Sequence, residues 1–138
     1  MVGQMRVEKI SPQSREMEIL FYYSQADGEG NKMLRMMEQL AGQVRVRVLR
    51  NWKIFSEELL KPHLDAAVAV VLISRREELL DAVSMRDLIH EYRLVLILPD
   101  RGEDTVSLGH SLRPNFMTYR MGDLRELEIV LKKMLHLE

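Results

Sequence analysis

The chain has 138 residues, of which 46% are hydrophobic and 30% are charged, and it contains no cysteine. This length suits one domain with a substantial core, and the lack of cysteine excludes disulfides, thiolate zinc sites and cysteine nucleophiles. With 20 basic and 21 acidic residues, the formal net charge is −1, which gives no reason to expect nucleic acid or a membrane surface as a partner.

The apolar runs of the sequence are short. The longest, AAVAVVLI and LVLIL, fall far below the roughly 20 residues that span a bilayer. The N-terminal segment has no continuous apolar stretch of the kind found in signal peptides, so we expect a soluble, cytoplasmic protein. Residues 1–16 carry no strong pattern and are predicted to be an extension that precedes a domain over residues 17–138.

The first half of that domain alternates between strand and helix patterns. MEILFYYS (17–24) is apolar and aromatic, which predicts a buried strand, and helical spacing follows over 30–43. VRVRVLR (44–50) alternates between apolar residues and arginine, which is typical of an edge strand with one wet face. A helix is predicted over 52–66, interrupted by Pro62.

The second half continues the alternation and raises the expected total to five strands and five helices. AVAVVLIS (67–74) and RLVLILPD (93–100) are apolar throughout, as central parallel strands are when helices cover both faces. The remaining predicted segments are a long helix over 75–92, a polar loop with one short helix over 101–114, a strand over 115–121 and a helix over 122–138 with Asp123 as its N-cap.

Strands separated by helices indicate parallel βαβ units in an open sheet with helices on both faces. The wet strand at 44–50 and the dry strands around it predict a three-layer α/β sandwich whose five-stranded parallel sheet has the flavodoxin-like order 2-1-3-4-5. In this order a ligand site is expected where the first and third strands end, so that YYSQADGEG faces LISRREE.

This layout resembles the receiver domain of bacterial two-component response regulators. Receivers carry an acidic pair after strand one, a phospho-accepting aspartate after strand three, a hydroxyl residue after strand four and a lysine after strand five. The resemblance assigns these positions here to residues that cannot hold Mg²⁺ and an acyl phosphate. It therefore implies a degenerate receiver, or pseudo-receiver, with switch-site positions Tyr23, Ser24, Asp27, Ser74, Arg75, Leu98 and Arg120.

The resemblance also implies a function. A pseudo-receiver works without phosphorylation, cofactor or catalysis, by binding another signalling protein or a second copy of itself. In receivers, the fourth helix, fifth strand and fifth helix carry the partner contacts. By position these contacts correspond to Leu108, His110, Arg113, Met117, Tyr119, Arg125 and Glu128.

Two other resemblances give alternative functions. ILFYYSQAD and VVLIS are similar to strand motifs of TIR domains, which are interaction modules or NAD-consuming enzymes; the enzymes need a glutamate on the following helix, where Glu77 and Glu78 stand early. SQADGEGN is similar to the phosphate loop of flavodoxins, which implies flavin binding, although Asp27 and Glu29 add negative charge there. The simpler interpretation is that the glycines shape a turn and that Asp27 or Asn31 caps a helix.

The four histidines show no metal-ligand spacing and are expected to be surface or core residues. They are His63, His90, His110 and His136.

Overall fold

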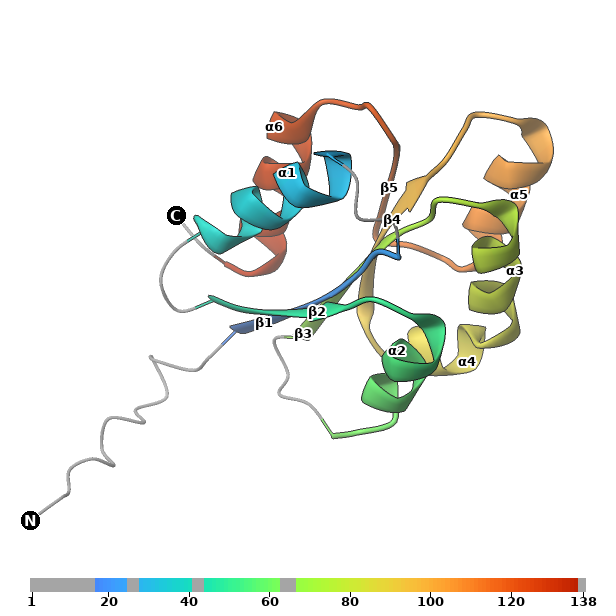
Figure 1. Ribbon diagram of the computed structural model, residues 1–138, viewed down its shortest axis with the longest axis horizontal. Helices are drawn as coiled ribbons and strands as arrows, with labels where there is room; N and C mark the ends of the chain where they lie inside the picture. Colours follow the sequence, from blue (N-terminus) through green and yellow to red (C-terminus); the bar gives the residue numbers. More distant parts are fainter. Residues whose placement is uncertain (1–16, 25–27, 41–43, 63–66, 137–138) are drawn as a thin grey trace, which may run out of the picture.

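A five-stranded parallel sheet forms the centre of the structure (Figure 1). The computed structural model describes residues 17–24, 28–40, 44–62 and 67–136. The strand order β2-β1-β3-β4-β5 confirms the predicted flavodoxin-like fold. The strands are β1 (Met17–Tyr22), β2 (Val44–Leu49), β3 (Ala67–Leu72), β4 (Arg93–Leu98) and β5 (Phe116–Tyr119).

Helices cover both faces of the sheet and make three layers (Figure 1). Helices α1 and α6 pack on one face, and α2 to α5 pack on the other. The helices in the described part of the chain are α1 (Gly28–Glu38), α2 (Trp52–Leu59), α3 (Arg76–Ser84), α4 (Arg86–Ile89), α5 (Glu103–Ser111) and α6 (Leu124–Met134). None of them is long and apolar enough to cross a membrane.

The central strands are apolar on both faces because each face is covered. In β1, Ile19 and Phe21 belong to the core under α1 and α6, whereas Leu20 and Tyr22 belong to the core under α2 to α5. All six residues of β3 are buried. The continuous apolar runs of the sequence therefore mark the middle of the sheet, as predicted.

Strand β2 lies at the edge of the sheet, as its alternating pattern predicts. Its three valines pack partly against the core under α1 and α6. On the other face, Arg47 lies 3.3 Å from the buried carboxylate of Glu58 and 3.8 Å from that of Glu18. This arginine thus pairs with acids of α2 and β1 in addition to placing charge on an edge strand.

The helix predicted over 75–92 is broken at Met85, whose backbone (φ −113°, ψ 21°) is not helical. Just before the break, the hydroxyl of Ser84 donates to the carbonyl of Asp81, a bond that competes with the helical ladder. The short α4 that follows buries Ile89. The prediction of one helix was wrong because the apolar pattern continues across a change of direction.

The predicted polar loop over 101–114 is largely helical, since α5 occupies nine of its residues. Its inward positions are Thr105 and Gly109, which carry little hydrophobic signal. A Cβ atom on Gly109 would lie 3.0 Å from side-chain atoms of Leu98 and Met117, so the glycine lets α5 approach β4 and β5 closely. Packing, rather than apolar periodicity, defines this helix.

Several predicted boundaries also shift. Helix α1 begins at Gly28, so Asn31 lies inside it and does not cap it. Helix α2 ends at Leu59, before Pro62. Asp123 caps α6 as predicted, with its carboxylate accepting from the N–H of Arg125 at 2.9 Å. The predicted extension at 1–16, Asp27 and His63 lie outside the described residues.

Candidate functional site

The candidate site lies at the carboxyl ends of β1 and β3, which are adjacent strands. Strand β2 flanks β1 on its other side. The connection that leaves β1 passes through α1 on one face of the sheet, and the connection that leaves β3 passes through α3 on the other face, so the two diverge. Ser24 follows β1 and Ser74 follows β3, and both are half-buried. This is the switch point at which the sequence predicts a ligand site.

A buried carboxylate, that of Glu78 in the first turn of α3, forms the centre of the site. Its Oε2 atom accepts from the hydroxyl of Tyr22 at 2.6 Å and from the hydroxyl of Ser24. Its Oε1 atom accepts from the backbone N–H groups of Ser74 at 2.8 Å and Arg75 at 3.3 Å. Only 5% of Glu78 is exposed, so four hydrogen bonds replace the water that this anion loses.

These contacts change the ionisation of both partners. Burial alone would raise the pKa of Glu78, but the hydrogen bonds from Ser24, Tyr22 and the two backbone N–H groups outweigh it and hold the pKa below its ordinary value. Burial and the neighbouring Glu78 carboxylate raise the pKa of the Tyr22 phenol. Near neutral pH the pair is therefore an anion held by a neutral phenol, and its carboxylate is a weak proton acceptor.

A second group of contacts brings the end of β5 to the same place. The guanidinium of Arg120 donates from Nη1 to Oγ of Ser74 at 3.2 Å and from Nε to Oε1 of Glu29 at 2.8 Å. The other carboxylate oxygen of Glu29 accepts from the N–H of Met121. Arg120 therefore reaches across β4 to β3 and also ties the N-terminus of α1 to the connection after β5.

Tyr23 points to the face of the sheet under α1 and α6, whereas Tyr22 points to the face under α2 to α5. Its ring stacks on Phe21, with centroids 4.7 Å apart, and the guanidinium of Arg50 lies 4.5 Å from its centroid. Its hydroxyl donates to Oδ1 of Asn31 at 3.2 Å. A Cβ on Gly30 would lie 2.4 Å from the ring, so this glycine makes room for the tyrosine. Tyr23 is thus part of the core beneath α1.

The structure brings together three of the predicted switch-site residues, Ser24, Ser74 and Arg120, through Glu78 and direct bonds. Arg75 is exposed and contributes its backbone N–H. Leu98 is buried, and its carbonyl accepts from the N–H of Arg120 at 2.8 Å.

Three members of the site were not predicted: Glu78 as its centre, Tyr22 as a donor to it and Glu29 as the partner of Arg120. One signal could have pointed to Glu78, because a glutamate in the first turn after a strand often bonds back to backbone N–H groups. The spacing rule for such a capping box favours Glu77, three residues after Ser74, whereas the structure uses Glu78.

The residues predicted to bind a partner border β5 from both sides, because α5 and α6 lie on opposite faces of the sheet. Leu108, Met117 and Tyr119 pack partly against the core under α2 to α5, whereas His110, Arg113 and Arg125 are exposed. Glu128 pairs with Lys132 at 3.4 Å. Their role in binding stays a prediction.

Within the ranges that the structure describes, no group of three or more histidine or acidic side chains could hold a metal ion. Nothing matches this chain among the protein-family models, the curated proteins or the solved structures with which it was compared.

Proposed function

We propose that this chain is a phosphorylation-independent pseudo-receiver that acts in signalling by binding another protein, either a different signalling protein or a second copy of itself. The observation that carries the proposal is the hydrogen bond from Arg120 to Ser74. In receivers, a lysine after strand five reaches the residue after strand three. Arg120 and Ser74 have this relation here, across the intervening strand β4.

The chemistry at the switch point supports independence from phosphorylation. Phosphoryl transfer to a receiver needs a carboxylate acceptor and oxygen ligands for Mg²⁺. The acceptor position here is a serine beside a guanidinium, which repels a divalent cation. The carboxylate of Glu78, which lies beside this serine, already accepts four hydrogen bonds.

The first experiment tests phosphorylation. The purified chain is incubated with acetyl phosphate and Mg²⁺ beside an active receiver domain as positive control, and intact masses are recorded. We expect the control to gain a phosphoryl group and this chain to remain unchanged. Acid-labile phosphate on this chain would contradict the proposal.

The second experiment tests binding. A photo-crosslinking amino acid is placed at His110 or Arg125, which are exposed beside β5, and at exposed Lys32 on α1 as the matched control. Sedimentation velocity of the purified chain reports a second copy, and crosslinking in the cells from which the chain comes reports a different partner. We expect crosslinks from the positions beside β5 only. Equal crosslinking from Lys32, or none from any position with a single monomeric species, would count against the proposal.

One observation bears on the TIR-like alternative: the carboxylate of Glu78 lies beside Ser24 at the switch point. An NAD-consuming enzyme would need this glutamate for substrate, whereas its oxygens are engaged within the chain. Incubation with NAD is therefore expected to release no nicotinamide. Release that the substitution Glu78→Gln abolishes would favour the TIR-like enzyme instead. The flavin-binding alternative predicts a yellow protein, and we expect a colourless one.

A further inference from the structure

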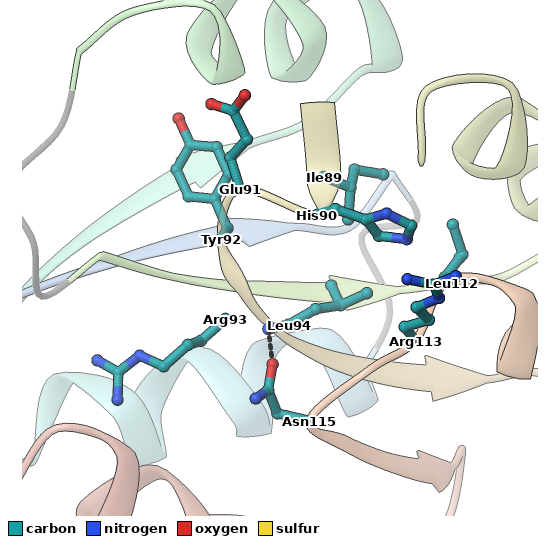
Figure 2. A pocket seen from close by; sticks show the side chains of 9 residues that line it. All are labelled: Ile89, His90, Glu91, Tyr92, Arg93, Leu94, Leu112, Arg113 and Asn115. Atoms are coloured by element: carbon teal, nitrogen blue, oxygen red, sulfur yellow. Dashed lines mark hydrogen bonds between the residues drawn. The ribbon is translucent and has the colours of Figure 1, made fainter. Parts of the chain in front are cut away.

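A cavity of about 350 Å³ lies at the amino-terminal ends of β4 and β5, the end of the sheet opposite to Glu78 (Figure 2). It is formed where the connection from α4 to β4 meets the connection from α5 to β5. Its size falls at the lower end of the range for small-molecule sites. The lining residues are Ile89, His90, Glu91, Tyr92, Arg93, Leu94, Leu112, Arg113 and Asn115.

The wall of the cavity lies over buried core residues and carries a fixed amide. Ile89, Leu94 and Leu112 are each 1% exposed. The Oδ1 atom of Asn115 accepts from the N–H of Leu94 at 2.8 Å, and the N–H of Asn115 donates to the carbonyl of Leu94 at the same distance. These two bonds hold the Asn115 side chain in place. Its amide nitrogen donates to no group in the described part of the chain.

The imidazole of His90 and the guanidinium of Arg113 both border this cavity. Figure 2 shows the imidazole of His90 turned toward Arg113, whereas the carboxylate of Glu91 extends to the other side. Within the ranges described, neither the imidazole of His90 nor the guanidinium of Arg113 has a hydrogen-bond or ion-pair partner. By contrast, Arg93 donates to the carbonyl of Met134.

The backbone of Arg113 gives a second, independent observation. With φ of 52°, Arg113 adopts the left-handed conformation just after α5, a position that glycine favours. An arginine there costs conformational energy that glycine would avoid. A left-handed residue ends many helices, and here the N–H of Arg113 donates to the carbonyl of His110 at 2.9 Å, which fixes where the Arg113 side chain leaves the backbone.

We infer that this cavity binds a small molecule that carries an oxyanion, either a carboxylate or a phosphate. Arg113 binds the oxyanion with its planar guanidinium, which matches the geometry of both groups. His90 and Asn115 donate further hydrogen bonds. None of these contacts involves the switch point. Arg113 is also one of the residues predicted to bind a partner, and titration of the purified chain alone tests the small-molecule site separately from that role.

Binding is tested by nuclear magnetic resonance on the ¹⁵N-labelled full chain. Inorganic phosphate, phenyl phosphate and benzoate are titrated separately at constant ionic strength, with sodium chloride as the balancing salt. We expect saturable shifts of the Leu94, Arg113 and Asn115 amide signals with at least one of the three anions. The stronger of the two organic probes identifies the oxyanion as phosphate or carboxylate.

Three variants test which side chains bind the anion. Arg113→Gly suits the backbone at this position, so it is expected to fold at least as well as the parent chain while weakening binding about tenfold. His90→Gln is expected to weaken binding less. Arg35→Gln, which removes one exposed positive charge from α1, is expected to leave binding unchanged. The inference is overturned if no probe saturates by about 20 mM, or if Arg113→Gly binds as tightly as the parent chain.

Discussion

The polar and charged side chains at the two ends of the sheet differ in their burial and in their hydrogen-bond partners. At the carboxyl end, Glu78 is buried and each of its oxygens accepts two hydrogen bonds. At the amino end, His90 and Arg113 are exposed beside a cavity, and within the described residues neither side chain has a partner. The carboxyl end, which holds the active site in enzymes of this architecture, thus has a buried carboxylate that is bonded within the chain, whereas the donors described at the amino end remain available to a ligand.

This difference indicates that the carboxyl end of the sheet contributes to the stability of the fold and the amino end to ligand binding. A buried anion whose partners all come from its own chain contributes to folding only as long as the whole set is present. Exposed donor groups such as those of His90 and Arg113 cost little because water solvates them, and they keep their capacity to bind an anion. We therefore expect substitutions at the carboxyl end to change the free energy of unfolding, and those at the amino end to change ligand binding.

The largest effect is expected from Glu78→Ala. It leaves the hydroxyl of Tyr22 and the N–H groups of Ser74 and Arg75 without their acceptor, which should lower the free energy of unfolding by about 3 kcal/mol. Urea denaturation measures the change. The neighbouring exposed residue supplies the control, since Glu77→Ala should cost less than about 1 kcal/mol. Equal costs for both would show that the network does not stabilise the fold.

A second test of the carboxyl end is Gly30→Ala. The new methyl group would lie 2.4 Å from the ring of Tyr23, so the buried ring must move, at a cost of about 2 kcal/mol. Gly28→Ala is the matched control, because a Cβ there has no neighbour within 4 Å. Thermal denaturation of both variants distinguishes them. If Gly30→Ala is as stable as Gly28→Ala, Tyr23 does not fill the face beneath α1 as described.

The contacts of Arg120 should matter less than those of Glu78. Arg120→Met removes the bonds to Ser74 and Glu29, and we expect a loss of about 1 kcal/mol because the pair remains partly solvated. The control is Arg125→Met, whose side chain is 88% exposed and lies 3.7 Å from Asp123; its effect should stay below about 0.5 kcal/mol. A larger loss for Arg125→Met would reverse this ranking.

The pH dependence of stability should carry the signature of Glu78. Its pKa is lower in the folded chain than its ordinary value of 4.5, so the unfolded chain binds a proton more readily. The stabilisation is therefore complete well above pH 4.5 and is lost as the pH falls through the folded pKa. The difference in unfolding free energy between the parent chain and Glu78→Gln should shrink below that pH. A difference that stays constant to about pH 3 would contradict this origin.

The smallest change in stability is expected at the amino end. Arg113→Gly relieves the left-handed backbone at φ 52° and should raise the free energy of unfolding by about 0.5 kcal/mol. Met121→Gly, at φ 66° after β5, should give a similar gain without affecting the binding of phosphate or benzoate. A clear loss of stability in Arg113→Gly would mean that its side chain serves the fold.

Much of the fold could be predicted because the hydrophobic pattern of each strand depends on which of its faces are covered. A strand covered on both faces must be apolar throughout, as in β3, and an edge strand with one wet face alternates, as in β2. The one short helix predicted within 101–114 could not be given its bounds, because Thr105 and Gly109, the inward residues of α5, carry little apolar signal. The break at Met85 was missed because side-chain periodicity does not report a backbone turn.

The candidate site was predicted only where strand ends define it. Ser24, Ser74 and Arg120 follow from the ends of three strands. Glu78 depends on the residue at which α3 begins, since its carboxylate reaches the N–H groups of Ser74 and Arg75 only with that start. Predicted boundaries are too imprecise to choose between Glu77 and Glu78. Likewise, His90 alone gives no sign of a site until Arg113 is placed beside it.

The sequence by itself therefore determined the layers, the strand order and the position of the switch point, because hydrophobic period is a local property and the dry or alternating pattern of a strand indicates whether it lies in the middle or at the edge of the sheet. Only the tertiary structure decided that Glu78 joins the ends of β1 and β3 and that Arg120 reaches Ser74 across β4. It also formed the cavity between the connections before β4 and β5. These features join residues far apart in the chain, and their geometry depends on packing that no local pattern encodes.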